Sequence, residues 1–267
     1  MLLVTTSHSL LLVDPLSGAM TPIHRGLGLY FGIATDGERY FVAARGRMVS
    51  SAEPAEGERG RILVFDRALR LVGEMQAPFP LRDLHEILWE PGRLWATCSY
   101  DNMVAIHDAG TGTWEEWYPL GRTPEPPYDL NHLNSLAMMD GALCMVAHNK
   151  GPSELLKFDP GSRALLSREP FGNQSHNIRR TGEGLVTCSS ADGALVGLNG
   201  WRLDVGGFPR GLLTQGSEYY VGISEILERK DRDLSNGKVL VFDPEWHPLR
   251  TIDLPGEGLV LDIQKAP

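Results

Sequence analysis

One short pattern recurs six times along the chain and constrains its fold more than any other feature. Each copy is an apolar run closed by Asp or Asn: "LLLVDP", "ILVFDR", "VAIHDA", "LLKFDP", "LVGLNG" and "VLVFDP". The closing residues are 40 to 52 positions apart, at Asp14, Asp66, Asp108, Asp159, Asn199 and Asp243. Runs of β-branched, aromatic and other apolar residues that end in turn chemistry are typical of β-strands. The spacing therefore predicts a repeated unit built from strands.

A second pattern lies upstream of five of these copies. It is a turn glycine followed by an apolar run, as in "DGERYFVAA", "PGRLWATCS", "DGALCMVAH", "TGEGLVTCS" and "QGSEYYVGIS". The two patterns together predict four strands in about 45 residues, which is the period of a propeller blade. Helical periodicity is nearly absent, so we predict an all-β fold, a six-bladed β-propeller.

The two ends of the chain complete the sixth blade. The N-terminal segment "LLVTTSHSLLLVDPLSGAMTPI" supplies three strands, and the C-terminal segment "GEGLVLDIQ" supplies one. We therefore expect a ring closed by a blade that the two termini share, which would leave no open sheet edge at the closure. Residues 1–267 are predicted to form a single propeller domain.

Charge and composition narrow the possible partners. The net charge is −9 and the pI is about 5.4, which argues against general affinity for nucleic acid or an anionic membrane. No apolar run approaches the roughly 18 residues of a membrane helix. The three cysteines fit no metal-binding spacing and the start lacks a basic leader, so we expect a cytoplasmic protein. Nothing in the sequence indicates its oligomeric state.

The first strand of each blade should line the central channel, with its first residue at one mouth of that channel. Alignment on the turn glycines gives one such residue per blade, starting from the shared blade. In blade order these residues are Glu257, Phe31, His85, Asn134, His176 and Arg210. His132 precedes Asn134 by two residues, so strand alternation puts it on the same side.

Loops between the second and third strands should open on the same face. Two are unusually long, residues 44–61 and 224–238, and residues 147–154 form a milder version. These loops are expected to bring a set of polar side chains to the mouth: Arg45, Arg47, His148, Glu225, Glu228, Arg229 and Lys230. Because propellers carry variable function in their loops, we expect a walled pocket there.

Four histidines are candidate ligands for a divalent metal ion: His85, His132, His148 and His176. Neutral imidazoles from separate strands can meet at one point, and three of them leave a coordination position open. Glu225 or Glu257 could lie nearby. The alternative is that these side chains only bind loop backbone or face a water-filled channel.

Arg210, in "GFPRGLL", is the candidate anchor for a substrate carboxylate or phosphate. An alternative for Arg210 is a structural salt bridge to Glu225. We expect His85, His176, Glu225 and Arg210 to be catalytic. Further contacts to the substrate are expected from Asn134, Glu257, Arg45 and Arg229.

Glu86 and Asn177 directly follow two of the histidines. Strand alternation predicts that they point away from the histidine side, where they would form hydrogen bonds between blades.

The segments "HLNSLAMMDG" and "GFPRGLLTQGSEYYVGIS" resemble parts of a bacterial family of propeller proteins of unknown function. This resemblance implies the propeller fold and a role for Asn134, Arg210 and Gly211, and it implies no reaction. Larger histidine-lined propellers, such as oligogalacturonate lyase and virginiamycin B lyase, indicate by analogy of fold that such a mouth can hold a metal.

These features favour a small-molecule enzyme: a hydrolase, lyase or isomerase that uses a divalent metal ion on an anionic substrate at the propeller mouth. The alternative is a non-catalytic propeller that binds a ligand or a protein partner on the same face. No sequence feature chooses among the three reactions.

Overall fold

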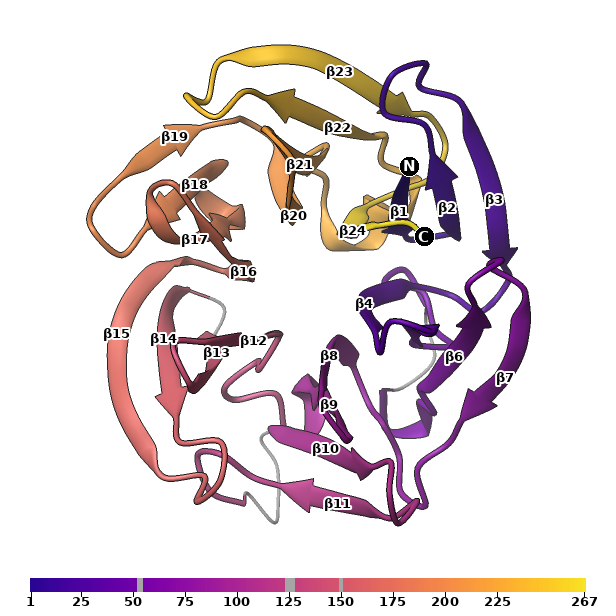
Figure 1. Cartoon of the computed structure of the whole chain (residues 1–267), viewed down its shortest axis with the longest axis vertical. Coiled ribbons are helices and arrows are strands. Elements are labelled where there is room, and N and C mark those ends of the chain that lie inside the picture. The colour runs from indigo at the N-terminus through magenta and orange to yellow at the C-terminus, as the bar shows by residue number, and fades with distance from the viewer. Residues whose placement is uncertain (52–54, 123–127, 149–150) are drawn as a thin grey trace.

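The computed structural model describes residues 1–51, 55–122, 128–148 and 151–267. Six four-stranded antiparallel sheets are arranged in a ring, as Figure 1 shows in a view down the ring axis. The prediction of a six-bladed β-propeller is therefore confirmed. We number the blades along the chain, with blade one containing both termini.

Within each blade the strands follow one another from the ring axis outwards (Figure 1). Blade one consists of β24 (Val260–Lys265), β1 (Leu2–Thr6), β2 (Ser9–Val13) and β3 (Met20–Arg25). Blade two consists of β4 (Tyr30–Thr35), β5 (Arg39–Ala44), β6 (Arg61–Asp66) and β7 (Leu71–Met75). Blade three consists of β8 (Leu84–Glu90), β9 (Arg93–Cys98), β10 (Met103–Asp108) and β11 (Trp114–Trp117).

The second half of the ring repeats this arrangement. Blade four consists of β12 (Ser135–Met139), β13 (Ala142–His148), β14 (Pro152–Phe158) and β15 (Leu165–Asn173). Blade five consists of β16 (Ser175–Thr181), β17 (Gly184–Ser189), β18 (Ala194–Gly197) and β19 (Arg202–Asp204). Blade six consists of β20 (Phe208–Gln215), β21 (Glu218–Ser224), β22 (Gly237–Phe242) and β23 (Pro248–Leu254). Short 3-10 turns lie in the loops: η1 (Ala55–Gly57), η2 (Ser99–Asp101), η3 (Ser190–Asp192) and η4 (Arg229–Leu234).

The repeated Asp or Asn has the same task in all six blades. Its side-chain Oδ1 accepts a hydrogen bond from the backbone N–H two residues later, at 2.9 Å from Asp14 to Leu16 and 3.0 Å from Asn199 to Trp201. Asp66, Asp108, Asp159 and Asp243 make the same bond. The pattern therefore marks the turn between the third and fourth strands of each blade, where the side chain replaces a backbone partner.

Both termini contribute to blade one. β1 pairs with β24 over residues 2–6, and the Ala266 N–H donates to the Met1 carbonyl at 3.2 Å. The two ends of the chain lie close together in Figure 1. The ring is therefore closed by strand pairing, as predicted.

Apolar side chains fill the spaces between neighbouring blades. One cluster joins blades two and three, where Phe41 and Trp89 stack with their ring centroids 5.3 Å apart. Another joins blades three and four through Trp95 and Leu143. Each sheet is thus covered by the next one, which explains why the strands are apolar on both faces.

The innermost strands are irregular near their first residues. Their pairing register shifts in blades one, two, three, five and six, which is the mark of a β-bulge. In blade three the shift falls between Leu84 and Ile87, and in blade five between His176 and Ile178. The bulges therefore coincide with the candidate residues His85, His176 and Arg210. Within the described residues, no helix is long and apolar enough to span a membrane.

Candidate functional site

A cavity of about 210 Å³ lies at the mouth of the channel where the innermost strands begin. Inner-strand segments and the residues before them supply Phe31, Asp83, His85, His132, Gln174, His176, Arg210 and Leu259. Loops supply Arg45, Val49, Asp129, Arg229 and Arg232, and the last residue of β13 supplies His148. The expected pocket on the histidine face is thus present, with both long loops contributing to its wall. Residues 52–54 and 149–150 of the expected loops lie outside the described residues.

The four predicted histidines meet in this cavity. The ring centroids of His85 and His132 are 4.9 Å apart, and those of His132 and His148 are 4.4 Å apart. His176 completes the group at 5.9 Å from His148 and 6.5 Å from His85. One ring nitrogen from each of His85, His132 and His176 lies within 4.8 Å of the others. Three blades thus bring imidazoles to one place.

A serine determines which nitrogen of His176 faces the cavity. The Ser190 hydroxyl donates to the Pro209 carbonyl at 2.7 Å, so its oxygen accepts the Nδ1–H of His176 at 2.9 Å. The proton therefore resides on Nδ1, and Nε2 carries the lone pair. His176 is 5% exposed, and its Nε2 is buried with no hydrogen-bond partner among the described residues.

Blade three repeats this arrangement. The Ser99 hydroxyl donates to the Leu133 carbonyl at 2.6 Å, and its oxygen lies 3.1 Å from His85 Nδ1. The same nitrogen donates to the Asp83 carbonyl at 2.8 Å. In both blades the serine follows its histidine by 14 residues and bonds a carbonyl of the next blade. The neutral imidazole of His85 therefore also keeps its lone pair on Nε2.

His132 is oriented by a carboxylate instead. Its Nδ1 lies 2.7 Å from Asp129 Oδ1, and a positive φ of 38° at His132 marks a turn before β12. A histidine held by a carboxylate through Nδ1 is a common arrangement around protein-bound metals. Asp83, Asp129 and His132 also form a group whose donor atoms lie within 4.8 Å of one another.

Burial keeps three of these histidines neutral. It lowers the pKa of His85 to about 3, even though Asp83 favours the protonated ring. Burial, with His132 and Arg210 adding to it, lowers the pKa of His148 to about 2. Burial and the positive charge of Arg210 also hold the pKa of His176 well below its ordinary value. At neutral pH these rings are therefore uncharged, which is the form that binds metals.

Arg45 forms buried ion pairs with two carboxylates of the protein itself. Its guanidinium makes two bonds to Glu58, at 2.9 and 2.8 Å, and its Nη1 lies 2.7 Å from Asp83 Oδ1. Burial alone would raise the pKa of Asp83, but Arg45 and the neighbouring His85 hold it well below its usual value. This buried triad fixes Asp83 beside His85 and leaves Arg45 little capacity for a substrate.

Arg210 is in the opposite situation. It is 8% exposed, and no carboxylate in the described part of the chain lies within ion-pair distance of it. Its guanidinium stacks over Phe208, 5.0 Å from the ring centroid, and its Nε has no hydrogen-bond partner among the described residues. Burial and the positive charge of Arg232 lower the pKa of Arg210 to about 9. A buried cation without a counter-ion is costly, so this side chain is prepared for an anion.

Two predicted acidic residues lie outside the cavity. Glu225 is exposed and accepts hydrogen bonds from Asn236, at 2.8 Å from the backbone N–H. The alternative of a structural Arg210–Glu225 salt bridge is therefore not formed, because Glu225 bonds to Asn236 of its own loop instead. Glu257 is buried against Thr6 and forms an ion pair with Arg25 at the side of blade one. Leu259 takes its place at the mouth.

The side chain of Asn134 forms hydrogen bonds within the protein that connect blades four and five. Its Nδ2 donates to the Ser175 carbonyl of blade five at 2.9 Å, and its Oδ1 accepts from Ser135. Arg229 lines the cavity as expected. Arg47, Glu228 and Lys230 are not among the described residues that line it.

Glu86 and Asn177 connect blades, as predicted, and neither of them lines the histidine cavity; their side chains meet across the channel. Asn177 Nδ2 reaches Glu86 Oε2 at 3.5 Å and Asp262 Oδ1 at 3.3 Å, and its Oδ1 accepts from the Gly211 N–H at 2.6 Å. The bulges interrupt strand alternation at these positions, so a residue and its successor both face inwards.

Sequence patterns missed several residues of the site, above all Asp83, Asp129, Gln174 and Arg232. A signal was available for Asp83, which stands two residues before His85, where alternation puts both on one side. The Asp129–His132 pair depends on a turn, and its spacing alone carries no recognisable motif.

No family model matches the sequence, and no curated protein matches it. Solved structures do match. A chain of the crystal structure of a nidogen/laminin complex has 10% identity and a TM-score of 0.65, over 98% of this chain and 96% of that chain. Virginiamycin B lyase from Staphylococcus aureus has 11% identity and a TM-score of 0.51, over 85% of this chain and 69% of that one.

A third similar structure is a protein of unknown function from Bacteroides caccae. It has 11% identity and a TM-score of 0.48, over 85% of this chain and 98% of that chain. At such identities the first two matches support the propeller fold and say nothing of the reaction.

Proposed function

We propose that this protein is a metal-dependent enzyme that acts on a small anionic substrate in the histidine-lined cavity. The observation that carries the proposal is the buried Nε2 of His176, which has no hydrogen-bond partner among the described residues while Ser190 holds Nδ1. A buried polar atom without a partner costs free energy that a metal ion would recover.

His85, His132 and His176 would hold the ion. Their Nδ1 atoms are bound by Ser99, Asp129 and Ser190, so each ring offers Nε2. A divalent ion held by three imidazoles supplies a Lewis acid with an open position for a substrate oxygen.

Arg210 would bind the anionic group of the substrate. Its guanidinium lines the same cavity as the histidines and lacks a carboxylate partner in the described chain. Arg232 and Arg229 add positive charge around it, whereas Arg45 is neutralised by Glu58 and Asp83. An anion here would be held by charge-assisted bonds to a buried guanidinium.

His148 would move the proton. It lines the cavity next to His132 and His176, and it is neutral. Because Arg210 contributes to the low pKa of His148, an anion that neutralises Arg210 would raise that pKa. Substrate binding would thus make His148 a stronger base. Hydrolysis, elimination and isomerisation all require such a step.

The metal site is tested with the metal alone. The purified protein is stripped with a chelator and titrated with Zn²⁺ by calorimetry. We expect one ion per chain, and we expect His85→Ala and His176→Ala each to abolish binding. Ser190→Ala should weaken binding about 10- to 100-fold and Ser190→Thr should restore it, because Ser190 positions the ring.

His247→Ala is the matched control. His247 belongs to an outer, partly exposed group with Asp243 and Glu245 whose donor atoms also cluster within 4.8 Å. Zn²⁺ binding should be unchanged in this variant. Loss of Zn²⁺ binding in His247→Ala, or wild-type Zn²⁺ binding in His176→Ala, would contradict the proposed metal site.

Catalysis needs its own experiment. The metal-loaded protein is incubated with a panel of small carboxylates and phosphate esters, and the products are identified by mass spectrometry. We expect turnover that is lost in both His176→Ala and Arg210→Gln. Tight binding of an anion that depends on Arg210, with no product from any member, would instead favour the alternative of a non-catalytic ligand-binding propeller.

A further inference from the structure

A second cavity, of about 300 Å³, lies further along the channel. The histidine cavity uses the first residues of the innermost strands, such as His85 and His176. The second cavity uses later residues of those strands, including Thr35 at the end of β4, Arg179 in β16 and Lys265 at the end of β24. It therefore belongs to the opposite end of the channel.

Three polar side chains separate the two cavities. Asn177 binds Glu86 and Asp262, and it accepts the N–H of Gly211. Asp262 accepts the N–H of Ile33 at 3.0 Å. These bonds connect blades one, two, three, five and six across the channel, so the second cavity is a compartment of its own.

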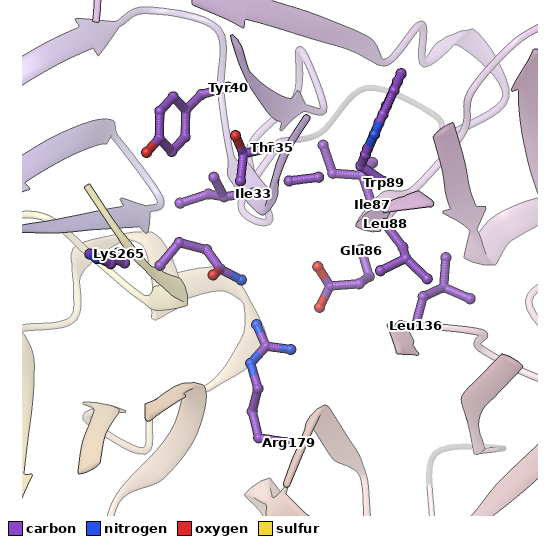
Figure 2. A pocket seen from close by; sticks show the side chains of 12 residues that line it. Ile33, Thr35, Tyr40, Glu86, Ile87, Leu88, Trp89, Leu136, Arg179 and Lys265 are labelled. Atoms are coloured by element: carbon purple, nitrogen blue, oxygen red, sulfur yellow. The ribbon is translucent and has the colours of Figure 1, made fainter. Parts of the chain in front are cut away.

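One part of the wall of the second cavity is apolar and another part is polar. Ile33, Ile87, Leu88 and Leu136 form an apolar part. Figure 2 shows the Glu86 carboxyl group and the Arg179 guanidinium pointing into the same space, with Leu136 beside Glu86. A water-filled channel has no need of such apolar lining, whereas an amphipathic ligand does.

The charge at the polar end favours an anion. Burial and the adjacent Asp262 carboxylate raise the pKa of Glu86 well above its usual value, which favours the protonated carboxyl group, a hydrogen-bond donor. The Nη1 of Arg179 donates to the Ile178 carbonyl at 3.0 Å, and its ion pair is long, 3.7 Å from Nη2 to Asp262 Oδ1, with the side chain 19% exposed. Lys265 adds a second positive charge at the exposed edge.

We propose that this cavity is a binding site for a small amphipathic monocarboxylate. The carboxylate would bind Arg179 and accept a hydrogen bond from Glu86, and the apolar part of the ligand would contact Ile33, Ile87 and Leu136. This site shares no lining residue with the histidine cavity. It therefore stands independently of the proposed metal-dependent reaction.

The test is a calorimetric titration of the 267-residue chain with octanoate. We expect one molecule per chain, with octanamide binding at least about tenfold more weakly because it lacks the charge. Arg179→Gln should weaken octanoate binding by about tenfold or more for the same reason. Ala34→Leu, which adds volume at the cavity wall, should reduce binding without removing any charge.

Two controls make the result specific. His176→Ala should bind octanoate like the wild type, because its side chain lines only the other cavity. Arg67→Gln, a change at a well-exposed arginine on blade two, should also have no effect. Failure of the wild type to bind octanoate, equal binding of octanamide, or wild-type affinity in both Arg179→Gln and Ala34→Leu would overturn the proposal.

Discussion

His85 and His176 show how one residue type acquires a defined role from its partners. Each is buried, and each has a serine 14 residues later that bonds to its Nδ1. The hydroxyl of each serine donates a hydrogen bond to a backbone carbonyl of the next blade. A lone histidine in an apolar strand could be a core residue with both nitrogens bonded. Here the serine at Nδ1 directs Nε2 of each histidine into the cavity, so the role of each ring is set by its own serine.

Glu86 gives a residue-scale prediction about pH. Its folded-state pKa lies above its unfolded value, so the unfolded chain releases this proton first as pH rises. The contribution of Glu86 to stability therefore falls as pH increases above about 4.3, the ordinary pKa of glutamate. Glu86→Gln keeps an acceptor for Asn177 and removes the titration. We expect its Tm, relative to the wild type, to rise from pH 5 to pH 8 in calorimetric scans.

The exposed Glu38 provides the comparison for this experiment. Glu38→Gln changes the same functional group at a side chain that is 78% exposed. Its Tm difference from the wild type should stay nearly constant over the same pH range. A Glu86→Gln difference that is flat or declines with pH would show that Glu86 is ionised in the folded protein.

At the scale of the element, the bulges of the innermost strands decide where polar side chains point. In blade six the bulge lies between Pro209 and Leu212 and includes Arg210 and Gly211. Gly211 has a φ of 78°, and a Cβ there would lie 2.9 Å from the side chain of Ile263. Its N–H also donates a hydrogen bond to Asn177 Oδ1. The bulge thus points the Arg210 side chain into the histidine cavity. It also places the Gly211 N–H against Asn177, one of the side chains that separate the two cavities.

Gly211→Ala is expected to destabilise the protein by more than the positive φ alone requires, about 1–3 kcal/mol for the backbone with a steric cost in addition. The matched control is Gly216→Ala in the β20–β21 turn, where φ is 62° and nothing lies within 4 Å of a new Cβ. Denaturant titration of both variants measures the difference. Equal losses at the two positions would mean that the contact with Ile263 is easily relieved.

At the scale of the whole molecule, closure by strand pairing holds the channel together. The β24–β1 ladder joins the two ends of the chain, and β24 also brings Asp262 into the partition. Asp262 depends on the ring being closed, because its partners lie in blades two and five.

Two circular permutants with Met1 joined to Pro267 test this closure. One is opened at residues 215–217, inside blade six, so that strand pairing still closes the ring. The other is opened between Ala77 and Pro78, between blades two and three, so that only side-chain packing closes it. We expect the second to have the lower Tm, because it lacks a ladder at the closure. Equal or reversed stabilities in thermal unfolding would contradict this role.

The sequence by itself determined the blade count, the shared closing blade and the face that carries the histidines. These features follow from strand periodicity and turn chemistry, which are local and recur with each repeat. His85, His132, His148, His176 and Arg210 could be placed in one cavity because the repeat fixes where each inner strand begins.

Only the tertiary structure decided which polar groups meet. It placed Asp83 and Asp129 beside the histidines, turned Glu225 and Glu257 to other partners, and moved Glu86 to a second cavity. A bulge shifts the side-chain alternation of a strand by one residue, and loop contacts join positions far apart in the chain. Both depend on the packing of neighbouring blades, which no local sequence pattern encodes.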